Sequence, residues 1–113
     1  EYIRCIIDYI KDYVEEYESM FCYSDEEQET CIYILTRTQI IRFTMLSHYC
    51  DAKIESYLVS DIKKITINQL DSIKSDHNDC EWTIDFGFEK ICIKCLSDYE
   101  DVRAFFKRII QLR

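Results

Sequence analysis

The sequence predicts an α+β domain, in which short antiparallel strands are preceded by one amphipathic helix and followed by another. Apolar residues recur every three or four positions in residues 2–21 and again in residues 102–109, as on the buried face of a helix. Between residues 31 and 96 they fall in six short β-rich runs about ten residues apart. Because no helix separates these runs, they indicate an antiparallel sandwich or barrel rather than a parallel sheet.

The first element is an amphipathic helix over residues 1–23. Its apolar stripe spans about 20 residues, which corresponds to roughly 30 Å of helix at 1.5 Å per residue. So wide a stripe has to be covered by the rest of the chain, by a protein partner or by a second copy of the chain. We therefore interpret the stripe as a partner-binding or self-association surface, with these residues as candidates: Ile3, Ile6, Ile10, Tyr13 and Tyr17.

Residues 24–30 contain no apolar side chain and are predicted to form a solvated acidic linker. The remaining domain, residues 31–113, begins with two strands joined at Arg37 and Thr38. The last two predicted strands meet near Gly87, the only glycine in the chain. The alternation of apolar residues predicts a core made of these side chains: Tyr33, Leu35, Ile41, Phe43, Leu58, Ile65, Ile67, Trp82, Ile84, Ile93, Phe105, Phe106 and Ile109.

The last element is a C-terminal helix. Ser97 and Glu100 have the Ser-x-x-Glu spacing of a capping box, and acidic residues in the first turn complement the helix dipole. Val102, Phe105 and Ile109 repeat at helical spacing. A buried apolar face on this helix is therefore expected to close the domain.

Composition and charge restrict the classes of function. The 113 residues are 48% hydrophobic, which suits one domain with its own core. The net charge is −8, and residues 1–29 alone hold ten acidic and two basic residues, so the excess of acid lies there. Nucleic acids and anionic lipids require a clustered basic face, so neither is expected as a partner. Because the chain begins with Glu1 rather than Met, we expect it to be a trimmed product.

The seven cysteines are scattered through apolar runs, which favours buried free thiols in a reducing, cytoplasmic compartment. Cys92 and Cys95 form a Cys-x-x-Cys pair, but on one strand their side chains point to opposite faces, so no redox pair is expected. An alternative is a metal or small-ligand site in two loops, formed by His48, Cys50, His77 and Cys80. We favour no cofactor and no metal.

Three stretches carry a family resemblance: "YILTRTQIIRF", "SYLVSDIKKITI" and "KICIKCLSDYEDVRAFFKRI". They resemble the first hairpin, the next strand pair, and the last strand and helix of bacterial pleckstrin-homology-like (PH-like or GRAM-like) domains. The resemblance implies an antiparallel β-barrel of six or seven strands capped by the C-terminal helix. It also implies a non-catalytic binding or scaffolding module, with protein–protein interaction as the expected function.

Many members of that superfamily bind phosphoinositides through basic residues near the first hairpin. The corresponding weak candidates here are Arg37, Arg42, Lys63 and Lys64. So few cations suit a polyphosphate headgroup poorly, and we do not expect membrane lipid to be the ligand.

Overall fold

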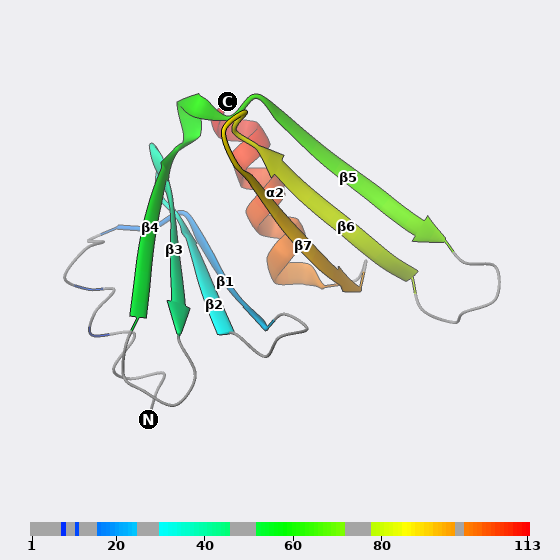
Figure 1. Cartoon of the computed structure of the whole chain (residues 1–113), viewed down its shortest axis with the longest axis horizontal. Coiled ribbons are helices and arrows are strands. Elements are labelled where there is room, and N and C mark those ends of the chain that lie inside the picture. Colours follow the sequence, from blue (N-terminus) through cyan, green and yellow to red (C-terminus); the bar gives the residue numbers. More distant parts are fainter. Residues whose placement is uncertain are drawn as a thin grey trace. The chain divides into compact units, whose positions relative to one another are not determined.

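The computed structural model describes residues 8, 11, 16–24, 30–45, 52–71, 78–96 and 99–113. The chain divides into two compact units, Glu1–Tyr57 and Leu58–Arg113. A four-stranded antiparallel sheet belongs to the first unit, and a three-stranded antiparallel sheet with one helix belongs to the second (Figure 1).

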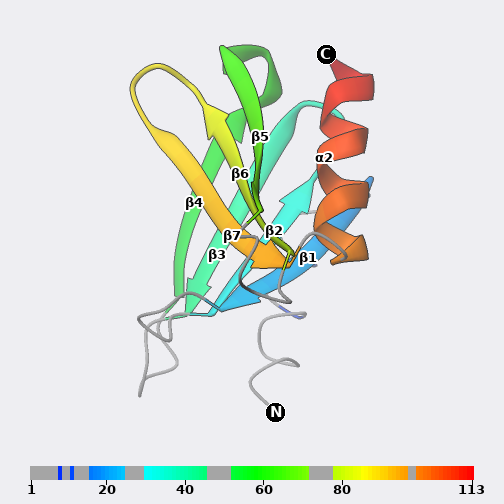
Figure 2. The same cartoon turned by 90° about the vertical axis from the view of Figure 1, so that its right-hand side faces the viewer.

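The four strands of the first sheet follow one another in chain order, as Figure 2 shows. They are β1 (Ser19–Ser24), β2 (Thr30–Leu35), β3 (Gln39–Met45) and β4 (Ala52–Leu58). The central strand β2 is apolar and buried along Cys31–Leu35, as expected for a strand covered on both faces. Alternate side chains of β2 and β3 form one buried cluster: Ile32, Ile34, Ile41 and Phe43.

The turn between β2 and β3 confirms the predicted hairpin. The Thr36 backbone N–H donates to the Gln39 carbonyl at 2.9 Å. The Thr36 hydroxyl oxygen accepts from the backbone N–H groups of Thr38 at 3.3 Å and Gln39 at 3.0 Å. Side-chain hydrogen bonding of this kind fixes a tight turn, and the exposed Arg37 lies at its tip.

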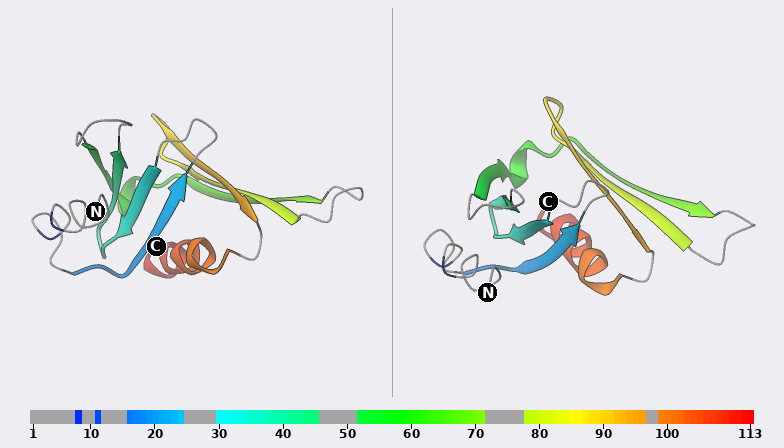
Figure 3. Two further views of the ribbon diagram at one scale, coloured as in Figure 1. Left: turned by 90° about the horizontal axis from the view of Figure 1, so that it is seen from below. Right: turned by 60° about the horizontal axis from the view of Figure 1, so that its bottom comes forward.

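The second sheet has the order β5 (Lys64–Asp71), β6 (Asn78–Asp85), β7 (Lys90–Leu96). The predicted hairpin at Gly87 is confirmed, since this residue lies between β6 and β7 with a φ of 91°, a conformation that favours glycine. The helix α2 (Glu100–Leu112) lies along one face of this sheet (Figure 3). Its four buried residues are Val102, Phe105, Phe106 and Ile109.

Aromatic contact joins α2 to the sheet. The Trp82 and Phe106 rings lie 5.0 Å apart between centroids with an interplanar angle of 45°. Phe105 and Phe106 lie 6.0 Å apart. These tilted arrangements are typical of well-packed aromatic cores. The prediction that the C-terminal helix buries its apolar face is therefore confirmed.

The predicted closed barrel is wrong. The strands form two separate sheets, and no ladder joins β4 to β5 in the described residues. A single 3₁₀ turn, Val59–Asp61, follows β4 directly, and β5 begins at Lys64 in the other sheet. Alternating apolar residues identify each strand, but they do not specify which strands pair, so the sequence could not exclude this arrangement.

The predicted N-terminal helix is wrong over Ser19–Ser24, which is strand β1. Phe21 is buried there and its neighbours Met20 and Cys22 are exposed, which is the period of a strand. Phe21 stacks on Tyr33 of β2 with ring centroids 4.8 Å apart, so tertiary packing decides the conformation. Of the rest of that predicted helix, residues 1–7, 9–10 and 12–15 lie outside the described residues.

The two end residues of the predicted acidic linker belong to strands. Ser24 is the last residue of β1 and Thr30 is the first residue of β2, and the two pair with each other. Residues 25–29 lie outside the described residues.

The predicted capping box is wrong, because α2 begins at Glu100 with Tyr99 as its N-cap and no side-chain cap hydrogen bond.

Most of the predicted core is buried, but three strand residues are not. Leu58 is 47% exposed and Ile67 is 45% exposed, and Ile65 is only partly buried. The two isoleucines belong to β5, an edge strand, where only one neighbouring strand shields them. The other predicted core residues are buried: Tyr33, Leu35, Ile41, Phe43, Trp82, Ile84, Ile93, Phe105, Phe106 and Ile109.

Candidate functional site

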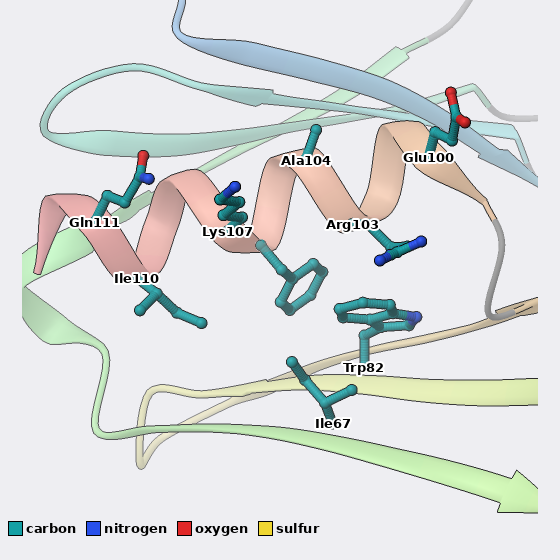
Figure 4. A pocket seen from close by; sticks show the side chains of 9 residues that line it. Ile67, Trp82, Glu100, Arg103, Ala104, Lys107, Ile110 and Gln111 are labelled. Carbon is teal, nitrogen blue, oxygen red and sulfur yellow. The ribbon is translucent and has the colours of Figure 1, made fainter.

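An apolar groove lies between β5–β6 and α2 in the second unit. Its volume is about 540 Å³, within the range of roughly 300–1,000 Å³ that is usual for ligand sites. Figure 4 shows Ile67 and Trp82 projecting from the sheet and Ile110 and Arg103 projecting toward them from the helix. The described residues that line it are Ile67, Trp82, Glu100, Arg103, Ala104, Phe106, Lys107, Ile110 and Gln111.

The groove exposes apolar side chains that a closed core would cover. Ile110 of α2 is 53% exposed, and Ile67, on the strand opposite, is 45% exposed. Ile67 pairs with Trp82 across β5 and β6, so both side chains lie on the face that α2 covers in part. Two half-exposed isoleucines facing one cavity leave apolar surface that a bound group would remove from water.

The indole of Trp82 supplies an unused hydrogen-bond donor. Trp82 is 6% exposed, and its Nε1 is buried without a hydrogen-bond partner among the described residues. A buried N–H group without an acceptor costs free energy, and buried tryptophans usually find a partner. The donor belongs to a residue that lines the groove, so an acceptor carried by a ligand would satisfy it once the side chains that cover Nε1 move aside.

Charge at the groove comes mainly from one side of α2. Arg103 and Lys107 are exposed and one helical turn apart, and Ile110 follows on the same face. Glu100 contributes the only carboxylate among the described lining residues. Residues 58–113 contain nine basic and ten acidic residues, so the excess of acid in this chain does not come from the unit that holds the groove.

The four cationic candidates are divided between the two units. Arg37 of the first unit is 83% exposed and its Nε lies 3.3 Å from Glu18 Oε1. In the second unit, Lys63 and Lys64 are exposed at the start of β5. Neither lysine lines the groove.

Arg42, the fourth candidate, is part of a polar cluster on the first sheet. Its guanidinium donates to Glu55 Oε1 from Nε at 3.0 Å and from Nη2 at 2.8 Å. Nη2 also donates to the Tyr57 hydroxyl at 2.9 Å, and the guanidinium lies 5.6 Å from the centroid of that ring. Burial disfavours the charged guanidinium, but the hydrogen bonds to Glu55 and Tyr33 outweigh it, so the pKa of Arg42 is raised. Arg42 is thus committed to a structural network.

Tyr33 of this cluster should make stability depend on alkaline pH. Burial raises the pKa of Tyr33 from 10.0 to about 12, although Arg42 opposes the shift. Between these values the unfolded chain loses the phenolic proton and the folded chain keeps it, so stability is full below pH 10 and falls as the pH rises toward 12. At pH 11 the loss from this residue should be about 1.4 kcal/mol relative to pH 8.

Urea unfolding of the wild type and of Tyr33→Phe at pH 8 and pH 11 measures this effect. The variant should lose less stability than the wild type between the two pH values, by about 1.4 kcal/mol. Equal losses in the two proteins would show that Tyr33 ionises normally in the folded state.

The strand interpretation of the Cys-x-x-Cys pair is confirmed, but the prediction of buried thiols is wrong for Cys22 and Cys92, which are exposed. Cys92 and Cys95 both lie on β7, where Cys92 is exposed and Cys95 is partly buried, so they do not share a face. Cys95 stands opposite Cys80 of β6. Cys80 is buried, and burial raises the pKa of its thiol.

Of the alternative metal site, only Cys80 can be located. His48, Cys50 and His77 lie outside the described residues. Among the residues that the structure does describe, no group of three or more histidine, cysteine, aspartate or glutamate side chains has the arrangement of a metal site. The metal hypothesis stays a prediction.

Of the predicted partner-binding residues, only Tyr17 is described. It is 57% exposed and precedes β1 outside any helix. The other four, Ile3, Ile6, Ile10 and Tyr13, lie outside the described residues.

The groove itself was missed at the level of sequence. Ile67 and Trp82 were assigned to a closed core, and Arg103, Lys107 and Ile110 were not named as candidate site residues. The available signal was the helical spacing of Arg103, Lys107 and Ile110, which puts an apolar side chain in line with two cations.

Comparison with family models, curated proteins and solved structures found no match to this chain. Among the described residues, no helix has the length and apolar character needed to cross a membrane.

Proposed function

We propose that this chain is a non-catalytic protein-interaction domain that binds its partner in the groove between β5 and α2. The observation that carries the proposal is a groove whose opposite walls hold two half-exposed isoleucines, beside a lining residue, Trp82, whose buried Nε1 has no partner among the described residues. A site with exposed apolar walls and one unused donor suits a ligand that brings both an apolar group and an acceptor.

The chemistry of the lining favours binding over catalysis. The groove is walled by Ile, Trp, Phe and Ala side chains, and its charged groups are long, exposed side chains of one helix. Exposed lysine and arginine side chains lose little of their hydration there, so they are suited to steering and pairing with a charged partner. General acid–base catalysis instead requires groups that are held rigidly within hydrogen-bonding reach of the reacting atoms.

The proposal is tested with the dye 8-anilinonaphthalene-1-sulfonate, whose aromatic rings and sulfonate match the groove in chemistry. Trp82 is the only tryptophan in the chain, so the tryptophan emission comes from a residue that lines the groove. We expect one dye molecule to bind per native chain and to quench the Trp82 emission by energy transfer. Ile110→Asp should weaken this binding at least about tenfold, because a carboxylate replaces an apolar wall and repels the sulfonate.

The control is Phe88→Asp, since Phe88 is 73% exposed and does not line the groove. This variant should bind the dye as the wild type does, with both variants checked for native circular dichroism. Random peptides displayed on phage are then selected against the full wild-type chain. Peptides that displace the dye and fail to bind Ile110→Asp support the proposal, and a selection that enriches no such peptide contradicts it.

A further inference from the structure

We propose that the partner segment is an extended acidic peptide that adds as a strand to the free edge of β5. It places a bulky apolar side chain between Ile67 and Ile110, and a carboxylate two residues away at Arg103, Lys107 and the Trp82 N–H. This inference rests on the proposed function and names the chemistry of the partner.

The extended conformation follows from the sheet. β5 is an edge strand of eight residues, and only its β6 edge is paired within the described part of the second unit. An unpaired edge offers a row of backbone donors and acceptors to an incoming strand. Ile67 on this strand also lines the groove, so a peptide on the edge of β5 would have alternate side chains pointing at the apolar walls.

The apolar anchor follows from the exposed isoleucines. Ile67 and Ile110 come from opposite walls of the groove, and Figure 4 shows the Ile110 side chain pointing from α2 toward the sheet. A leucine-sized or phenylalanine-sized side chain between them would cover both isoleucines at once. Apolar anchors of this kind, seated in a partner's pocket, usually dominate the affinity of a peptide.

The carboxylate of the peptide is inferred from the positive charges of Arg103 and Lys107 and from the indole N–H of Trp82, which is unpaired among the described residues. Ile110 lies three residues from Lys107 and seven residues from Arg103, which is about 4.5 Å and 10.5 Å along the helix axis at 1.5 Å per residue. Alternate residues of a strand repeat at about 6.6 Å, so a carboxylate two residues from an anchor at Ile110 would fall between the two cations. An acidic residue at Arg103 brings acceptor oxygens to the wall that holds Trp82 Nε1, where a charge-assisted hydrogen bond would satisfy the indole.

The tightest displayed peptide that displaces the dye is the starting point of the test. It should contain an apolar residue and an acidic residue two positions apart. In its synthetic form, changing the acidic residue to its amide should weaken binding to the wild type about tenfold, the size expected for a hydrogen bond to a charged group. Against the Arg103→Gln and Lys107→Gln double variant, the acidic and amide peptides should bind alike. N-methylation of the backbone nitrogens that would face β5 should abolish binding.

Each contrary outcome has a defined meaning. If the amide peptide binds the wild type as tightly as the acidic one, and Ile110→Asp still abolishes binding, the proposed function stands and the acidic partner is contradicted. If the N-methylated peptide binds normally, strand addition is contradicted. If light scattering shows a dimer that Ile110→Asp converts to a monomer, a second copy is the occupant and the partner proposed is wrong. If no enriched peptide displaces the dye, the proposed function fails as well.

Discussion

Replacing Phe105 with alanine is expected to lower the free energy of unfolding by about 3–5 kcal/mol. Phe105 is fully buried on α2, in ring contact with Phe106, which itself packs on Trp82. The substitution removes an aromatic ring from the face that holds the helix and leaves a cavity, and both effects are destabilising. Urea unfolding followed by circular dichroism gives the change.

The matched control is the same substitution at Phe88. This side chain is 73% exposed and stacks on Phe86 with ring centroids 6.0 Å apart, so Phe88→Ala should cost below about 1 kcal/mol. A loss of less than about 1 kcal/mol for Phe105→Ala would contradict the account, because it would place that face of α2 on the surface.

Replacing Glu55 with alanine is expected to cost about 2–3 kcal/mol. The Arg42 and Glu55 side chains are only 17% and 22% exposed, and the carboxylate accepts two hydrogen bonds from the guanidinium. It also accepts one from the Tyr57 hydroxyl at 3.2 Å. Removing the carboxylate leaves a partly buried guanidinium without its counter-charge. The resulting loss of folding stability is larger than the net stability that the intact ion pair contributes.

A double-mutant cycle separates the cost of leaving the Arg42 charge unpaired from the net contribution of the Arg42–Glu55 pair. The change from Arg42 to methionine in the Glu55→Ala background should recover part of the loss, because the unpaired charge is gone. At the pair formed by Glu18 and the exposed Arg37 in the same unit, Arg37→Ala should cost less than about 1 kcal/mol. Strictly additive losses for the Arg42 and Glu55 changes would show that the hydrogen-bonded pair is not coupled in solution.

Local patterns in the sequence predicted the local structure well. The hairpins at Thr36–Gln39 and at Gly87, and the C-terminal helix with Phe105 and Ile109 on its buried face, were all predicted from turn chemistry and periodicity. Each of these signals is contained within one or two neighbouring elements. Their success therefore reflects how little they depend on the rest of the chain.

The errors arose where distant residues decide the outcome. The segment Ser19–Ser24 contains one buried phenylalanine, Phe21, which stacks on Tyr33 of β2. This contact fixes the segment as a strand, although the spacing of its apolar residues also fits a helix. The number of sheets depends on which strands pair after Leu58, and alternation of side chains does not encode that choice. The groove exists because the Ile67 side chain is left 45% exposed. This exposure could be predicted only if β5 were already known to be an edge strand.

The most direct test of the groove as a binding site is the indole signal of Trp82 in a ¹H–¹⁵N correlation spectrum. The chain has one tryptophan, so this signal is unique, and its proton belongs to the donor that lacks an acceptor among the described residues. Titration with the tightest selected peptide should move the indole proton downfield in a saturable manner, as a hydrogen bond to a carboxylate forms, and the amide form of the peptide should move it less. An indole signal that stays in place while the peptide binds at full stoichiometry would contradict the account.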